Sequence, residues 1–180
     1  VSLNGARVVA LELAARPLAL PRALGAGLVA RARVALSSLP AALAEAAEDV
    51  ARGGSPTRLA SLVGLGEGLT PSADDLIVGV LAGLDLVCRA APAAAAARRD
   101  LVRSLPADLE ARTTRISAQA LTAAADGMYA APLLTLAEAL GQQAADDAVE
   151  ALVTELVSVG HRSGSDVLTG LVTALERALT

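Results

Sequence analysis

Aromatic side chains are nearly missing from this sequence: it has no Trp or Phe, and Tyr129 is the only Tyr among 180 residues. Hydrophobic residues nevertheless make up 54% of the chain. The core must therefore consist mainly of Ala, Leu and Val, whose modest size lets helices approach one another closely. A chain of this length suits a single domain, so we predict one domain over residues 1–180.

Long hydrophobic runs and basic blocks are also missing. The longest clean apolar run, Leu76–Leu84, ends at Asp85 and falls far short of the ~20 residues that a membrane-spanning helix needs. The net charge is −4, and no basic cluster or aromatic stacking platform is present, which argues against a nucleic-acid surface. We therefore expect a soluble protein that binds neither membranes nor nucleic acids, despite a mean hydropathy of +0.54.

Three chemically useful residue types are scarce. All 15 basic residues are Arg, so a Schiff-base lysine and the lysine of a phosphate-binding P-loop are excluded. Cys88 is the only cysteine, which excludes an internal disulfide and is typical of a reducing, cytoplasmic location. His161 is the only histidine, so this chain has no zinc site of several histidines. The chain starts at Val1 without an initiator Met or a signal-peptide pattern, as expected of an excerpt that lacks an N-terminal portion.

The pattern of apolar positions is helical over most of the chain. Residues 6–13, "ARVVALEL", alternate loosely and predict a short strand. After Pro17 the helical pattern takes over, with Pro and Gly at the ends of segments. The predicted helices cover about 21–36, 40–52, 56–63, 72–89, 92–105, 107–125, 133–140, 143–158 and 164–179. We predict an all-α fold: one compact multi-helix domain with a short N-terminal strand at its edge.

Residues 64–76, "GLGEGLTPSADDL", are the part of the chain richest in conformationally special and polar residues. A later stretch repeats part of this pattern: Ser72–Gly79 aligns without gaps on Ser163–Gly170, with a Ser, an Asp three residues later and a Gly one turn beyond. In each copy the Ser is placed to cap a helix, and the Asp carboxylate can reach back to the Ser N–H.

The two repeated glycines indicate close helix packing. Gly inside a helix costs roughly 1 kcal/mol relative to Ala, a cost that is easier to understand if another backbone packs there. We predict that the two helices are structurally equivalent, cross at Gly79 and Gly170, and direct their N-termini toward one pocket. Two capping boxes, with Asp75 and Asp166 as their acids, would by themselves show only two well-started helices.

Polar residues around these helix starts exceed what capping requires. The first start adds Thr70, Asp74 and a glycine loop, and the second adds His161 and Arg162. Because exposed N–H groups at helix starts bind anions readily, a pocket for phosphate or carboxylate is the alternative to simple capping.

Familiar cofactor motifs do not fit the glycine stretch. Residues 64–68, "GLGEG", do not match the dinucleotide fingerprint, because the spacing differs and a helix precedes them. Asp74 and Asp75 lack the further acid expected of aspartate-rich diphosphate–magnesium sites, although two carboxylates could hold one Mg²⁺ through waters. We therefore name Mg²⁺ as a possible cofactor and assign no metal ligands.

The stretch "GLGEGLTPSADDLIVGVLAGL" at residues 64–84 resembles the hallmark of the AllH-like subunit family of oxamate carbamoyltransferase. That hallmark is a glycine-rich approach, then Leu-Thr-Pro-Ser-Gly-Asp-Asp, then a helix with a glycine one turn on. Two weaker matches follow in the expected order, "TTRISAQALTAAADG" (Thr113–Gly127) and "GHRSGSDVLTGL" (Gly160–Leu171). The sequence departs from the hallmark at Ala73, where Gly is usual, and at Glu67, where Pro is frequent.

The resemblance implies a subunit of a multi-component enzyme of purine (allantoin) catabolism. That enzyme interconverts oxalurate plus phosphate with oxamate plus carbamoyl phosphate. The implied partners are the other subunits of a hetero-oligomer and a small anionic metabolite. The motif positions that carry over are Thr70, Ser72, Asp74, Asp75, Thr114, Ser117, Ser163 and Asp166.

Carbamoyl transfer requires charge stabilisation on the phosphate, polarisation of the carbamoyl oxygen and removal of a proton from the attacking amide nitrogen. Backbone N–H groups at the two helix starts would serve the first two requirements. For the third, Asp74 and His161 are the catalytic candidates, and Asp75 is a weaker one because capping would occupy it. The candidate substrate-binding residues are Gly66, Gly68, Thr70, Ser72, Asp75, Thr114, Arg115, Ser117, Arg162, Ser163 and Asp166.

Two other functions fit the same sequence. One is a non-catalytic helical scaffold or effector-binding subunit, and the other is a Mg²⁺-dependent hydrolase of a phosphorylated or carbamoylated metabolite. The orientation of Asp74 and Asp166 separates the possibilities. An open cavity that both carboxylates face favours the enzyme subunit, a closed cavity with both used in capping favours the scaffold, and a metal on Asp74 favours the hydrolase.

Overall fold

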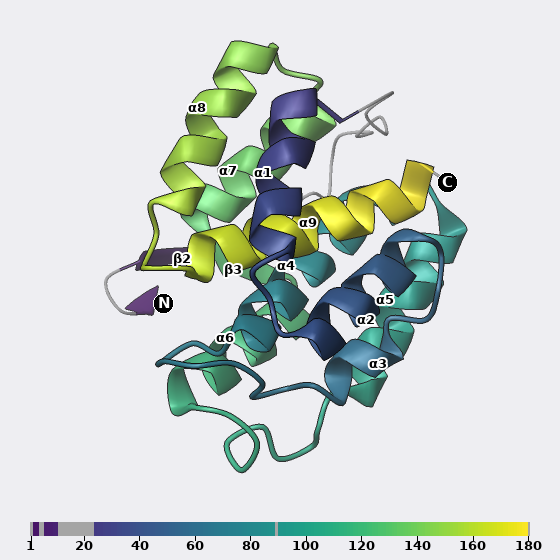
Figure 1. Ribbon diagram of the computed structural model, residues 1–180, viewed down its shortest axis with the longest axis vertical. Coiled ribbons are helices and arrows are strands. Elements are labelled where there is room, and N and C mark those ends of the chain that lie inside the picture. The colour runs from purple at the N-terminus through teal and green to yellow at the C-terminus, as the bar shows by residue number, and fades with distance from the viewer. Residues whose placement is uncertain (1, 4–5, 11–23, 89, 180) are drawn as a thin grey trace.

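Helices dominate the computed structural model, which describes residues 2–3, 6–10, 24–88 and 90–179. The helices are α1 Ala26–Leu36, α2 Ala41–Ala51, α3 Thr57–Ala60, α4 Ser72–Val87, α5 Pro92–Ser104, α6 Arg115–Ala125, α7 Ala131–Gly141, α8 Asp146–Val157 and α9 Ser163–Leu179. Helices α4 and α9 lie across each other at the centre, and the others pack around them (Figure 1). The predicted all-α fold is confirmed. None of the helices in these ranges is long and apolar enough to cross a membrane.

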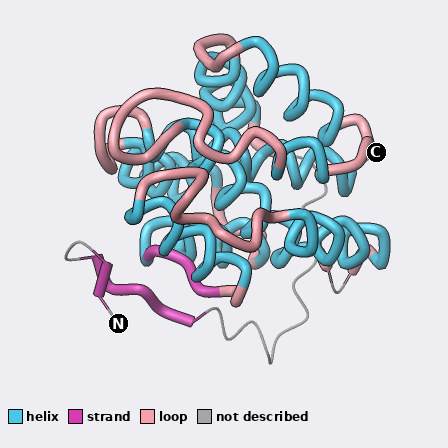
Figure 2. Tube along the Cα trace, turned by 90° about the horizontal axis from the view of Figure 1, so that it is seen from below, coloured by secondary structure: helices cyan, strands magenta, loops and turns pink. Residues whose placement is uncertain are grey.

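A small antiparallel sheet lies at one edge of the helical body (Figure 2). Its strands are β1 Ser2–Leu3, β2 Ala6–Ala10 and β3 Met128–Ala130, with β2 in the middle. The predicted strand over residues 6–13 is confirmed for 6–10, and 11–13 lie outside the described residues. Strand β3 was not predicted, because three residues between two helices are too few to show an alternating pattern.

Helix α4 is buried on every side, as a central helix of mainly Leu, Val, Ile, Ala and Gly can be. All of its residues except Val78 and Asp85 are buried. It meets α9 with the backbones almost in contact at two glycines. A Cβ added to Gly79 would lie 2.9 Å from the Leu171 nitrogen, and one added to Gly170 would lie 2.8 Å from the Val80 nitrogen. The predicted crossing at Gly79 and Gly170 is confirmed.

The C-terminal half of α4 is anchored by a polar cluster that contains the only aromatic residue. Asp85 accepts hydrogen bonds from the Arg98 guanidinium on α5 and, at 2.5 Å, from the Tyr129 hydroxyl on β3. Arg98 also donates to the Ala125 carbonyl at the end of α6, at 3.0 Å. Pairing and hydrogen bonding offset the desolvation of these groups, so the cluster joins four elements around one end of the central helix.

The predicted helix over residues 107–125 is wrong in its first part. Residues 107–114 form turns, in which the Leu109 carbonyl accepts from the backbone N–H groups of both Arg112 and Thr113 at 3.0 Å. Thr114 then adopts an extended conformation, and its hydroxyl caps α6 by accepting from the Ser117 N–H at 3.2 Å. A Thr cap is a strong local start signal, and it lies inside the range that apolar periodicity alone had assigned to one helix.

Candidate functional site

A loop with three left-handed glycines leads into α4. Gly64, Gly66 and Gly68 have φ values of 85°, 127° and 93°, which residues with a side chain rarely adopt. Space is also lacking at Gly66, because an added Cβ would lie 2.5 Å from the Ser72 backbone nitrogen. The glycines therefore let the loop fold directly over the first turn of α4.

Part of this loop has backbone N–H groups that make no hydrogen bond within the described structure. Within the described part of the chain, no residue from 66 to 70 donates its backbone N–H in a hydrogen bond. Helix α4 follows Pro71 without a side-chain cap, and the Ala73 N–H donates to the Leu65 carbonyl at 3.0 Å. Free amides next to the positive end of a helix dipole are suitable donors for an anion.

The start of α9 lies beside the start of α4. The Thr70 and Ser163 hydroxyl oxygens are 2.7 Å apart and share a hydrogen bond. Next to this contact is a cavity of about 1120 Å³, which we call the helix-start hollow. Seven of the predicted site residues line it: Gly66, Gly68, Thr70, Ser72, His161, Arg162 and Ser163.

Asp74, a predicted proton acceptor, lies outside the lining of this hollow and is only 1% exposed. Its Oδ1 accepts from the Gly64 N–H at 2.8 Å, and its Oδ2 accepts from the Thr113 hydroxyl. The carboxylate therefore fixes the glycine loop and the turn before α6. With both Asp74 oxygens occupied, Asp74 and Asp75 do not fit the water-bridged Mg²⁺ arrangement considered above. In the described ranges, no group of three or more His, Cys, Asp and Glu side chains could hold a metal ion.

The serine–aspartate pairs are exchanged between the two helices. The Ser163 hydroxyl lies beside the Asp75 carboxyl and lowers its pKa, and the Ser72 hydroxyl does the same for the Asp166 carboxyl. The predicted capping of α4 by Ser72 is wrong, because the residue at the cap position is Pro71 and no side chain caps this helix. The glycine crossing brings the two helix starts so close together that each Asp meets the Ser of the other helix.

Asp75 is an unusual carboxyl group. It is only 9% exposed, and its Oδ2 is buried without a hydrogen-bond partner within the described residues. Burial raises the pKa of Asp75 from 3.8 to about 7; the Ser163 and Thr70 hydroxyls oppose this rise, and the charges of Asp166 and Asp74 add to it. Asp75 therefore changes its charge near neutral pH.

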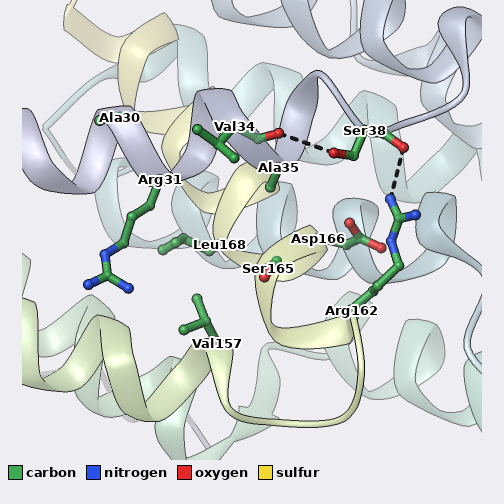
Figure 3. Close-up of a pocket in the computed structure, with 10 residues that line it drawn as sticks. All are labelled: Ala30, Arg31, Val34, Ala35, Ser38, Val157, Arg162, Ser165, Asp166 and Leu168. Atoms are coloured by element: carbon green, nitrogen blue, oxygen red, sulfur yellow. Dashed lines mark hydrogen bonds between the residues drawn. The ribbon is translucent and has the colours of Figure 1, made fainter.

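Asp166 has a different environment. Burial also raises its pKa, but the Ser72 hydroxyl and the positive charge of Arg162 oppose the rise. Asp166 and Arg162 line a second cavity, of about 580 Å³, between α1, α8 and the start of α9 (Figure 3). The Arg162 guanidinium donates to the Ser38 carbonyl at 2.9 Å. Because Arg162 and Ser38 line both cavities, this bond lies on the boundary between them.

The predicted residues on α6 lie next to the hollow and do not line it. Thr114 donates to the Leu69 carbonyl at 2.6 Å and so holds the glycine loop. The Ser117 hydroxyl is buried and has no hydrogen-bond partner among the described residues. Arg115 is exposed, and the α6 residue that does line the hollow is Ile116.

Sequence reasoning missed the residues that close one side of the hollow. Ser38, Leu39 and Pro40, between α1 and α2, belong to the lining. They are more than 100 residues from Arg162 in the sequence. The hydrogen bond from the Arg162 guanidinium to the Ser38 carbonyl joins this segment to the start of α9. Every residue has a backbone carbonyl, so no sequence motif could have indicated this contact.

Comparison with known proteins identifies a family. Residues 62–175 match the family described as oxamate carbamoyltransferase subunit AllH. The matched part includes the glycine loop, α4, α6 and most of α9. No curated protein and no solved structure matched the chain. Since the match covers more than half of the sequence, the chain belongs to the family of the oxamate carbamoyltransferase subunit AllH.

Proposed function

We propose that this carbamoyltransferase subunit binds a small anionic reactant in the helix-start hollow. The ligand class is the phosphate or carboxylate group of carbamoyl phosphate, phosphate, oxamate or oxalurate. The observation that carries the proposal is the set of unpaired backbone N–H groups at residues 66–70, beside the starts of two helices, in one open cavity.

Several hydrogen-bond donors and the positive ends of two helix dipoles lie together at the hollow, which suits an anion. Helices α4 and α9 have 16 and 17 residues, long enough for the full positive partial charge of roughly +0.5 at each N-terminus. The Thr70 and Ser163 hydroxyls add side-chain donors at the same place. Arg162 and His161 line the hollow, and the Arg162 guanidinium supplies a positive charge there.

The nearby carboxyl groups do not oppose anion binding as strongly as their number suggests. Asp74 is buried and accepts two hydrogen bonds, and Asp166 lies beside Arg162. Asp75 is protonated below about pH 7, so it is uncharged over much of the range in which the anion would bind. Anion affinity should therefore increase as the pH falls through 7.

This arrangement supports two of the three requirements of carbamoyl transfer. Loop amides and helix dipoles would stabilise the charge on the phosphate and polarise the carbamoyl oxygen, the kind of preorganised electrostatic stabilisation that contributes most to many enzymes. As a member of a subunit family, the chain works with other subunits, which could complete the site.

The effector-binding alternative uses the same hollow. Asp74 accepts two internal hydrogen bonds and does not line the hollow. Asp166 lines the second cavity, and the hollow is open, so neither the enzyme criterion nor the scaffold criterion is met in full. The enzyme-subunit and effector-binding functions both predict anion binding in the hollow, but only the first predicts that the bound anion reacts. An assay for oxalurate phosphorolysis by the assembled enzyme therefore separates them.

The binding test is isothermal calorimetry and thermal unfolding with phosphate, carbamoyl phosphate and oxamate, each with and without Mg²⁺. A ligand at 100 times its Kd should raise the unfolding free energy by roughly 2.7 kcal/mol. Arg162→Gln should weaken binding. Arg115→Gln is the matched control, since Arg115 is exposed and does not line the hollow. Equal effects of the two substitutions, or no stabilisation by any anion, would reject the proposal.

A further inference from the structure

The two exchanged Ser–Asp pairs are related by the helix crossing, but they differ chemically. In one pair Asp166 has the positive charge of Arg162 nearby, and both residues line the second cavity (Figure 3). In the other pair Asp75 has two hydroxyls, those of Ser163 and Thr70, and no cation contributes to its environment. Pairs of titratable groups whose environments differ in this way usually have different roles in acid–base chemistry.

The Asp75 pair connects a buried carboxyl to the hollow. Asp75 itself does not line the hollow, but Ser163 and Thr70 do, and both hydroxyls lie beside its carboxyl and favour its charged form. The two hydroxyl oxygens are 2.7 Å apart. Oδ2 of Asp75 has no partner in the described structure, so the carboxyl has an acceptor position that the fold leaves unused.

We propose that Asp75 accepts the proton released in carbamoyl transfer and receives it through the Ser163 hydroxyl, with Thr70 holding that hydroxyl in place. The inference rests on the proposed function, because Ser163 must meet a reactant bound in the hollow. Ser163 is then the group that touches the reactant, and Asp75 is a positioning residue that acts through it.

The step balances without any further reactant. The amide nitrogen of the acceptor attacks the carbamoyl carbon of carbamoyl phosphate, a C–N bond forms, and the C–O bond to phosphate breaks with its electron pair on the phosphate oxygen. The nitrogen gives a proton to Ser163 Oγ as the Ser163 hydroxyl proton passes to the Asp75 carboxylate. Asp75 returns a proton by the same route to the leaving phosphate, which ends as hydrogen phosphate. The reverse reaction runs the same transfers backwards.

Other titratable groups near the hollow suit this role less well. Asp74 has both oxygens occupied. Burial raises the pKa of Asp166, although Ser72 and Arg162 oppose this rise, and Asp166 lines the second cavity and not the hollow. His161 lines the hollow but is exposed, and no hydrogen bond within the described residues holds its ring in place. A proton acceptor works best when its pKa lies near the working pH, and the pKa of Asp75 is about 7.

The experiment measures carbamoyl transfer against pH with the full chain assembled with its partner subunits, and phosphate binding by calorimetry in parallel. In the wild type, kcat/KM should rise with pH and level off above about 7. Asp75→Asn should keep phosphate binding, lower kcat by roughly 10²- to 10⁴-fold and remove the inflection. Ser163→Ala should lower kcat and remove the inflection in the same way, with some loss of phosphate affinity because one of the donors to the anion is removed, and Ser163→Thr, which keeps a hydroxyl, should recover most of the lost rate.

Asp166→Asn is the matched control on the other pair. It should keep the inflection and move it to lower pH, because the charge of Asp166 raises the pKa of Asp75. Circular dichroism checks folding, and if Asp75→Asn does not fold, Ser163→Ala and Ser163→Thr decide the question. Phosphate binding with an unchanged rate and pH profile in these variants overturns the proton relay alone. Absence of phosphate binding in the wild type overturns the relay and the proposed function together.

Discussion

Replacing Gly79 with Ala should separate the two central helices. The added Cβ would lie 2.9 Å from both the nitrogen of Leu171 and the carbonyl carbon of Val167, and closer still to the Val167 carbonyl oxygen. Ordinary contact distances begin near ~3.5 Å, so relieving the contact with the Val167 carbonyl oxygen would require α4 and α9 to move apart by about an ångström or more. Neither obstacle is a flexible side chain, because all three atoms belong to the backbone of α9.

The expected loss is large for one methyl group. Overpacking typically costs about 1–3 kcal/mol, occasionally more, and here the collision is with the backbone at the most buried crossing. The better helix propensity of Ala returns up to about 1 kcal/mol. With the overpacking cost at the top of this range, about 3 kcal/mol or more, the net loss in the free energy of unfolding should be at least about 2 kcal/mol, or at least roughly 4–8 °C in Tm for a chain of this size.

The assay is urea and thermal unfolding followed by far-UV circular dichroism, since the chain has no Trp and one Tyr. Gly27→Ala on α1 is the matched control, because Gly27 is exposed and its added Cβ meets only the end of the Glu150 side chain, at 3.3 Å. It should be neutral or stabilising by up to about 1 kcal/mol. If Gly79→Ala is as stable as the wild type, the close crossing of α4 and α9 is wrong.

Three further predictions concern the polar groups around α4. Asp74→Ala leaves the Gly64 N–H and the Thr113 hydroxyl without their acceptor, so we expect a loss of about 2–4 kcal/mol in urea unfolding; a loss below about 1 kcal/mol would contradict the anchoring role. The pKa of Asp75 is 3.8 in the unfolded chain and about 7 in the folded protein, so the folded state binds more protons between these values. The resulting stability is present at acidic pH and lost as the pH rises from about 4 to about 7, in total about 4 kcal/mol at 1.36 kcal/mol per pKa unit. The measurement is the difference in unfolding free energy between wild type and Asp75→Asn across this pH window. A difference that does not change with pH would refute the raised pKa of Asp75. Tyr129→Phe removes the 2.5 Å hydrogen bond to Asp85 and should lower the urea midpoint by the equivalent of about 1–3 kcal/mol, whereas Thr135→Val, at an exposed hydroxyl on α7, should change it little.

The helical fold and the central crossing could be predicted because their signals are local. Apolar periodicity and Pro or Gly at segment ends indicated the helices, and the repeated glycines at 79 and 170 indicated the crossing. The predicted start of α6, at about residue 107, is wrong because the apolar periodicity continues through Thr114, whose side chain caps the helix. Strand β3 is only three residues long and forms through pairing with a distant segment.

The sequence indicated residues that the structure brings together, but it did not indicate the contacts between them. Seven of the candidate residues line one hollow, because the repeat placed two polar helix starts on helices that cross. The partners of Asp75 and Asp166 depend on that crossing: a capping rule looks three residues along the chain, whereas the contacts are between helices. Ser38 contributes its carbonyl, a group that every residue has, so its part in the site could come only from the structure.

The place where an anion binds is the most direct test of the proposed function. A crystal structure of the protein grown with phosphate answers this, and it needs neither an assigned substrate nor turnover. We predict phosphate in the helix-start hollow, with its oxygens at hydrogen-bond distance from backbone N–H groups of residues 66–70 and near Ser163. Phosphate bound only elsewhere, or a hollow that excludes it at concentrations that stabilise the protein, would contradict the account.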